Sequence, residues 1–347
     1  MALRAALVLV VLAGLISCRA QEQTTLAPYL ERPASDEVIY FVMADRFENA
    51  DPSNDRGGLS GGRLEHGFDP THKGFFHGGD LKGLTQRLDY IRGLGATAIW
   101  LTPIYKNRPV QGRPGAESAG YHGYWITDFT DVDPHLGDRD DFKDFVDAAH
   151  AQNMKVYLDI VVNHTADVIY YEECHGLAAD PDVSEPGACP YRDTLQKPYV
   201  FKKQGELRNE GFLGDRGQAL NAENFANLTD MTYAYTPVVP EGQEAVKVPA
   251  WLNDVRFYHN RGDSFWEGES ATHGDFQGLD DVFTEHPQVL SGFIDIYKQW
   301  ITDFRIDGFR IDTAKHVNPE FWPPFNTAMI EHARSLGIPN FHIFGEV

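Results

Sequence analysis

The sequence has little basic charge, few cysteines and only one long apolar run. Its 347 residues include 30 Lys and Arg against 51 Asp and Glu, which gives a formal net charge of -21. Proteins that bind nucleic acids present clusters of Lys and Arg to the phosphate backbone, and no such cluster occurs here. The sequence also has no detectable internal repeat or low-complexity tract. These absences exclude repeat architectures and argue against a nucleic-acid partner.

The apolar run at residues 5–16 follows a short basic start and is too short to span a bilayer. It is typical of a secretory signal, expected at residues 1–20, so we expect an exported protein. The string at 15–18 (LISC) resembles the lipobox of bacterial lipoproteins, in which a lipidated Cys18 would tether the protein to a membrane. Cleavage after Ala20 is the alternative. The sequence therefore predicts a bacterial protein that is secreted, periplasmic or anchored to the outer membrane.

Two further cysteines, Cys174 and Cys189, lie in a stretch rich in Gly and Pro. In an oxidising compartment this spacing predicts one loop-closing disulfide. Two free thiols are the alternative. Zinc ligation together with His175 is a weaker one, because the spacing lacks the CxxC form of common zinc sites.

After a polar linker that ends near Ser35, short apolar runs rich in β-formers alternate with longer helical patterns. This alternation is typical of βα units and a parallel sheet. The expected strands are 38–43, 97–101, 155–162, 306–311 and 341–347, and the expected helices are 81–94, 140–152, 287–302 and 320–336.

Residues 165–283 interrupt this alternation, because they show no clear periodicity. Structureless loops of this length are rare in compact domains, so we expect an inserted subdomain between two parts of one barrel, 36–164 and 284–347. The five expected strands fall short of the eight in a (β/α)8 TIM barrel, and an open barrel would expose parallel edges. We therefore expect an α/β chain that is a truncated part of such a barrel. A complete five-stranded open sheet is the alternative.

Polar residues end the third, fourth and fifth expected strands, where barrel enzymes carry their catalytic groups. Arg310 and Asp312 are two residues apart on one strand, so their side chains point the same way, and Arg310 is expected to keep Asp312 ionised. Glu346 ends the next strand, faces the same cavity and would be free to have a raised pKa. Such a pair of carboxylates is what glycoside hydrolysis requires. A structural ion pair is the alternative for Arg310 and Asp312.

Three strings at these strand ends resemble the ordered signature regions of the α-amylase family, glycoside hydrolase family 13: 159–164 (DIVVNH), 308–316 (GFRIDTAKH) and 344–347 (FGEV). Residues 119–125 (AGYHGYW) and 79–84 (GDLKGL) are similar to further family segments. The resemblance extends over nearly all of the chain after residue 38, the insertion excepted. It implies hydrolysis of α-1,4-glucosidic bonds in starch-like glucans or maltooligosaccharides.

The resemblance also implies a role for each matching residue. Asp312 would be the nucleophile, Glu346 the general acid and base, and Arg310 would orient the nucleophile. Tyr124 would stack beneath the sugar at the cleavage subsite, and Asp159 would be structural. The residues implied to bind substrate are His122, Tyr124, His164, Lys315 and His316.

A Ca2+ site is implied as well. Asn163 and Asp281 would supply side-chain oxygens and His316 a backbone carbonyl, which suit a hard cation. A ligand from the insertion is expected, with Asp230 as a guess. The alternative is that Asn163 and Asp281 only hydrogen-bond loop backbone.

Within the family, neopullulanase, cyclomaltodextrinase and transglycosylase activities are alternatives. A non-catalytic glucan-binding protein is another, although such a protein has no need of a carboxylate pair. In the family, a third catalytic aspartate follows the seventh strand, and the sequence as written does not extend that far. We therefore expect the chain as written to be inactive or nearly so.

Overall fold

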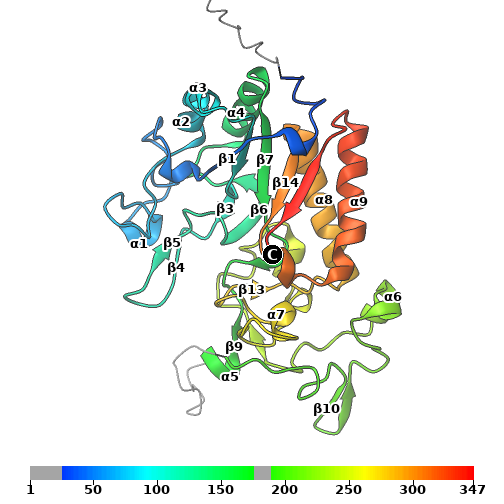
Figure 1. Cartoon of the computed structure of the whole chain (residues 1–347). Coiled ribbons are helices and arrows are strands. Elements are labelled where there is room, and N and C mark those ends of the chain that lie inside the picture. The colour runs from blue at the N-terminus through cyan, green and yellow to red at the C-terminus, as the bar shows by residue number, and fades with distance from the viewer. Residues whose placement is uncertain (1–25, 176–188) are drawn as a thin grey trace, which may run out of the picture.

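The computed structural model describes residues 26–175 and 189–347 (Figure 1). The expected signal segment, with Cys18, lies outside these residues. Within them, we find no helix with both the length and the apolar character needed to cross a membrane.

All five expected strands form one parallel sheet, in chain order. Two interior strands, β7 and β14, are buried along their whole length, as expected for a sheet covered on both faces. Arg310 on β14 lies opposite Asp159 on one neighbour and Phe344 on the other. The strands are β1 (Ile39–Val42), β2 (Ala98–Leu101), β7 (Lys155–Ile160), β14 (Gly308–Ile311) and β15 (His342–Gly345).

Three long helices follow the expected pattern: α4 (Arg139–Ala151), α8 (Pro287–Phe304) and α9 (Trp322–Ser335). Figure 1 shows α8 and α9 side by side along β14 and β15, and these two helices contact each other. Apolar residues of α8 form much of the core against the sheet. Tyr297 packs edge-on against Phe309, with ring centroids 5.5 Å apart.

The helix expected at 81–94 is two helices, α2 (Leu81–Gln86) and α3 (Leu88–Gly93), because Arg87 leaves the helical conformation. The predicted apolar stripe is buried as far as Ile91, but Leu94 lies past the helix end and is exposed. That part of the prediction was wrong.

The sequence analysis also missed the strands between β2 and α4. The seven-residue strand β6 (Ile126–Val132) pairs with β3 (Tyr105–Asn107), and the pairing register shifts twice. Buried and exposed residues therefore do not alternate regularly along β6, and the sequence shows no strand pattern there. The remaining strands there are β4 (Val110–Gln111) and β5 (Ser118–Ala119), whereas the short helix α1 (Arg63–His66) lies earlier, between β1 and β2.

Between β7 and α8 the residues that the structure describes form only short elements, and in Figure 1 these lie beyond the carboxyl ends of the strands. A small aromatic core, which includes Tyr199, Phe212 and Phe283, holds part of this segment together. The expected disulfide is present, with the Cα atoms of Cys174 and Cys189 5.5 Å apart. The elements are β8 (His164–Thr165), β9 (Tyr170–Tyr171), α5 (Glu172–His175), β10 (Phe201–Lys203), β11 (Glu206–Arg208), α6 (Ala222–Phe225), β12 (Pro237–Val238), α7 (Ser270–His273) and β13 (Asp280–Asp281).

Candidate active site

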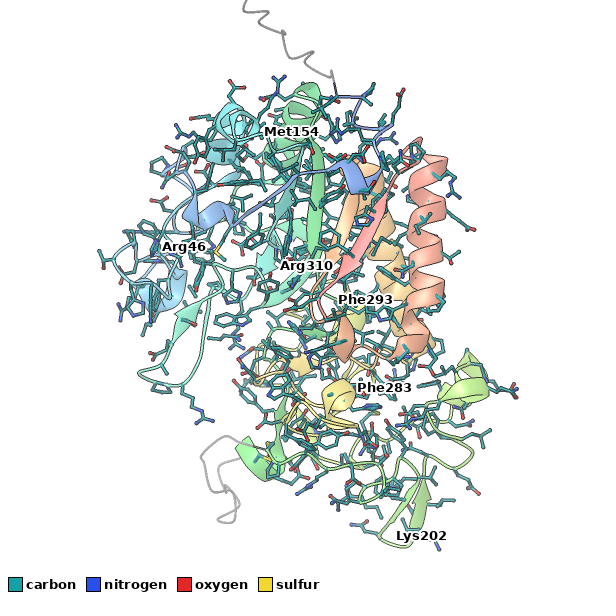
Figure 2. The ribbon with its side chains drawn as sticks, viewed as in Figure 1. Arg46, Met154, Lys202, Phe283, Phe293 and Arg310 are labelled. Carbon is teal, nitrogen blue, oxygen red and sulfur yellow. A yellow bond between two sulfur atoms is a disulfide. The ribbon has the colours of Figure 1, made fainter. Side chains whose placement is uncertain are left out.

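A cleft of about 1670 Å3 lies at the carboxyl ends of the strands, between the sheet and the inserted segment. Figure 2 shows Arg310 in this region, between the strands and the segment that holds Phe283. The structure brings to the cleft both predicted carboxylates and all five residues predicted to bind substrate. These lining residues are His122, Tyr124, His164, Asp312, Lys315, His316 and Glu346.

Arg310 joins carboxylates from three neighbouring strands. Its Nη1 donates to Oδ1 of Asp312 and to both carboxylate oxygens of Asp159, each at 3.0 Å. Its Nη2 donates to Oε2 of Glu346 at 2.8 Å. The strand pairing accounts for this arrangement. Arg310 lies opposite Asp159 on β7 and opposite Phe344 on β15, and Glu346 follows two residues after Phe344, directly past the end of β15. The predicted contact between Arg310 and Asp312 is therefore present, and Asp159 completes a carboxylate trio.

The pKa values of the two predicted catalytic carboxylates differ from the expectation. Burial raises the pKa of Asp312 to about 6, against the lowering effect of Arg310. Burial also tends to raise the pKa of Glu346. The hydrogen bond from the Thr313 N–H and the charge of Arg310 outweigh burial, so the pKa of Glu346 is lowered. The reason is exposure: the Asp312 side chain is 11% exposed and that of Glu346 is 49% exposed. A sequence pattern does not reveal this difference.

Thr313 has a left-handed backbone, with φ of 48°, directly after Asp312. This conformation is unusual for a β-branched residue, and such strain is concentrated at functional sites. Here it turns the backbone N–H of Thr313 toward Oε2 of Glu346, at 3.2 Å. The turn thus helps to hold Glu346 beside Asp312.

Tyr124 and His122 come from the loop between β5 and β6. The Tyr124 hydroxyl donates to Oδ2 of Asp159 at 3.0 Å, which fixes the ring at the wall of the cleft. His122 stacks on Tyr124, and its Nδ1 accepts the backbone N–H of Tyr124 at 3.1 Å. Burial, helped by the charge of Arg46, lowers the pKa of His122 to about 4. His122 is therefore neutral, with its proton on Nε2, where it can be donated to a ligand.

His164 is buried at the start of β8 and stacks on Phe276. Burial lowers its pKa to about 4, so its ring is neutral as well. Within the described part of the chain, its Nε2 makes no hydrogen bond. Because His164 lines the cleft, this unpaired ring nitrogen is suited to a hydroxyl of a bound ligand.

His316 also lines the cleft, and its Nδ1 contacts the carbonyl oxygen of Ala271 at 2.7 Å. Trp266 and Phe276 pack against its ring, each with centroids 5.6 Å away, and both line the cleft. The sequence analysis missed these two aromatic residues, because they lie in the segment without periodicity. The sequence signal that could have found them is a tryptophan near a glycine, Trp266, and in the structure its side chain is 41% exposed.

The predicted Ca2+ donors Asn163 and Asp281 are brought together by the β8–β13 ladder, which pairs His164 with Asp281. Val282 also donates its backbone N–H to the Asn163 carbonyl at 2.8 Å. However, Oδ2 of Asp281 lies 2.5 Å from Nδ1 of His259, so one carboxylate oxygen already has a partner. The donor set fits a hard cation through the other oxygen and the Asn163 amide.

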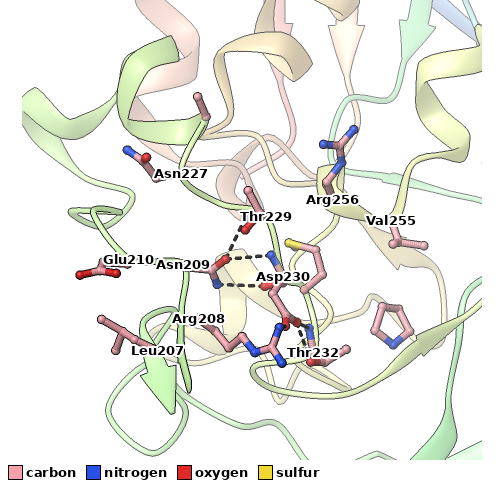
Figure 3. Close-up of a pocket in the computed structure, with 13 residues that line it drawn as sticks. Leu207, Arg208, Asn209, Glu210, Asn227, Thr229, Asp230, Thr232, Val255 and Arg256 are labelled. Carbon is pink, nitrogen blue, oxygen red and sulfur yellow. Dashed lines mark hydrogen bonds and ion pairs between the residues drawn. The ribbon is translucent and has the colours of Figure 1, made fainter. Parts of the chain in front are cut away.

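Asp230 does not fit this donor set. Its carboxylate accepts hydrogen bonds from Thr232 and faces Arg208, in a second hollow of about 620 Å3 (Figure 3). There Asn209 bonds the backbone of Thr229 and Asp230, so its polar atoms brace the loop.

Comparisons with known proteins agree with this geometry. Residues 41–344 match the family "Alpha amylase, catalytic domain". An α-amylase of Streptomyces lividans is 50% identical over 83% of this chain and 29% of that protein. The periplasmic α-amylase of Escherichia coli (strain K12) is 32% identical over 90% of this chain and 45% of that protein. An Anoxybacillus α-amylase structure, 31% identical, matches with a TM-score of 0.57 over 91% of this chain and 48% of that one. The chain thus spans less than half the length of these relatives.

Proposed function

This chain belongs to the α-amylase family of glycoside hydrolases, and we propose that the protein carrying it hydrolyses α-1,4-glucosidic bonds in starch-like glucans or maltooligosaccharides with retention of configuration. The observation that carries this proposal is the shared contact of Arg310 with Asp312 and Glu346. One guanidinium holds both carboxylates at the mouth of a cleft. Retaining glycosidases need two carboxyl groups close together, about 5–5.5 Å apart.

Asp312 attacks the anomeric carbon of the bound glucose unit while the bond to the leaving oxygen breaks. Glu346 gives its proton to that oxygen. Glu346 then removes a proton from water, whose oxygen displaces Asp312 from the anomeric carbon. One water is consumed, and both carboxyl groups return to their starting states.

Glu346 must be protonated for the first step, although its pKa is lowered in the free structure. Its side chain is half exposed, so a bound glucan would cover it and remove water. Desolvation favours the neutral acid, so substrate binding raises the pKa of Glu346 at the point where a proton is needed.

The neutral rings of His122 and His164 would hydrogen-bond sugar hydroxyls, contacts that can strengthen as the ring flattens. Tyr124 would support the sugar face, and Lys315 and His316 would contact the leaving-group side. All of these residues line the same cleft, which supports these roles.

We infer that Ca2+ is held by the Asn163 amide oxygen, Asp281 and the His316 backbone carbonyl. The ion would stabilise the junction between the barrel strands and the insertion, residues 165–283, which we propose as a subdomain. Export is supported by the periplasmic relative in E. coli. Lipidation of Cys18 would add a membrane tether.

Product analysis tests the proposal. Full-length protein is incubated with soluble starch and with pullulan, and the products are separated over time. Maltooligosaccharides from starch are expected. Cyclic or elongated products would instead support glucan transfer, the activity named for CldA, a cyclomaltodextrin glucanotransferase whose structure is 31% identical with a TM-score of 0.59. Binding of starch without release of sugar would overturn the enzyme proposal.

A further inference from the structure

Four ionisable side chains that the proposed mechanism does not use meet between the insertion and the start of α8. We call them the histidine cluster: Asp215, His259, His273 and Glu285. All four are buried, with side chains no more than 9% exposed. Asp215, His259 and His273 come from the insertion, whereas Glu285 lies two residues before α8.

The Nε2 atoms of both histidines face the same carboxylate. His259 Nε2 lies 2.9 Å from Oε2 of Glu285, and His273 Nε2 lies 3.3 Å from Oε1. His273 Nε2 is also 3.3 Å from Oδ2 of Asp215. Ligand atoms of His259, His273 and Glu285 all lie within 4.8 Å of one another. The cluster therefore directs nitrogen and oxygen donors toward one small volume.

The opposite nitrogen of each ring is already oriented. His259 Nδ1 lies 2.5 Å from Oδ2 of Asp281. His273 Nδ1 lies 2.8 Å from the Thr272 hydroxyl and 3.3 Å from the Glu269 carbonyl oxygen. Metal-binding histidines commonly have their second nitrogen bound to a carboxylate or carbonyl in this way, which fixes the tautomer and directs the free nitrogen.

A buried ion-pair network is the alternative explanation, and it accounts for the contact of His259 Nε2 with Glu285 at 2.9 Å. Hydrogen bonds between charged N–H and carboxylate groups are typically about 2.7–2.9 Å long. The two contacts of His273 Nε2 are longer, at 3.3 Å each. Donors about 2.0–2.1 Å from a tetrahedral Zn2+ are separated from each other by about 3.3 Å. The long contacts thus have the spacing of neighbouring ligands around one ion.

We propose that Asp215, His259, His273 and Glu285 bind one Zn2+ ion. Two imidazoles and two carboxylates are a suitable donor set for Zn2+, and four protein ligands make a closed site without an open position for catalysis. The ion links three distant parts of the insertion to the segment before α8. Asp281 connects this site to the proposed Ca2+ donors, since it orients His259 through Oδ2.

The test is zinc binding by chelator-treated protein. We expect one equivalent of Zn2+ by elemental analysis after gel filtration, retained in excess Ca2+, and a higher thermal midpoint on adding Zn2+ alone. His273→Gln and Asp215→Asn should each weaken binding at least tenfold. His286→Gln, a change of a nearby histidine outside the cluster, should leave it unchanged.

Cobalt provides a measurement on the unmodified protein, so the proposal stays testable if the variants fail to fold. Co2+ in the wild-type protein should give the strong visible absorption of a tetrahedral site, and Zn2+ should displace it. Absence of bound zinc, absence of the cobalt band, or full zinc binding by folded His273→Gln would each overturn the proposal. The cluster would then be an ion-pair network only.

Discussion

Glu346 accepts a hydrogen bond of 2.8 Å from Nη2 of Arg310, whose Nη1 donates to the proposed nucleophile Asp312 at 3.0 Å. Both proposed catalytic carboxylates are therefore oriented by one cation that is itself buried. The consequences for rate, stability and pH dependence differ, and each can be measured.

Removing either carboxylate should abolish turnover but not the fold. We expect Asp312→Asn and Glu346→Gln each to lower kcat on starch by several orders of magnitude, because each removes one of the two chemical groups. Asp295→Asn and Glu331→Gln, matched changes at exposed helix positions, should keep the wild-type rate. A rate near wild type in either site variant would refute its assignment.

Removing Arg310 should also lower stability. Arg310→Gln leaves Asp159 and Asp312 buried without their cation, and breaking a buried pair in this way costs about 3–5 kcal/mol. Arg256→Gln, which breaks an exposed pair with Asp254, should cost at most about 1 kcal/mol. Urea unfolding measures both. Equal losses of unfolding free energy in the two variants would mean that Arg310 does not neutralise the carboxylate trio.

Activity should fall on the acid side near pH 6. The raised pKa of Asp312, about 6, means that this nucleophile becomes protonated as the pH falls through that value. The pH profile of kcat/KM, which reports the free enzyme, should therefore have an acidic limb near 6. A limb near 4 would show that burial does not perturb Asp312.

The two buried carboxylates, Asp159 and Asp312, link the free energy of unfolding to pH. Burial raises the folded-state pKa of Asp159 to about 7 and that of Asp312 to about 6, above their unfolded values. Their contribution to stability is therefore fully present below about pH 4 and is lost as the pH rises through 6 to 7. Asp159→Asn should reduce this slope in unfolding measurements from pH 4 to 8. An unchanged slope would assign the effect to other groups.

Calcium should stabilise the junction of barrel and insertion. Added to metal-free protein, Ca2+ should raise the thermal midpoint of the wild type, because it binds the folded state. Asn163→Ala should remove most of that increase, whereas the response to Zn2+ should persist. A Ca2+ response that is equal in both proteins would remove Asn163 from the site.

Much of the barrel could be predicted because its strands are short, buried apolar runs that differ from amphipathic helices in period. The pairing of Arg310 with Asp312 followed from the two-residue repeat of a strand. Sequence patterns could not give the order of the pKa values, which depends on how far Glu346 is exposed. Nor could they indicate the histidine cluster, because His259 and His273 meet Asp215 through loops without periodicity.

The most direct test of the central claim is the site of covalent labelling by an activated fluorosugar, such as a 5-fluoro α-glucosyl fluoride, which slows release of a glycosyl-enzyme. Full-length protein is treated, digested and sequenced by mass spectrometry. The account predicts one glycosyl group on Asp312, lost on longer incubation as the intermediate turns over. A label on Glu346 or another residue, or starch cleavage that yields products of inverted anomeric configuration, would contradict it.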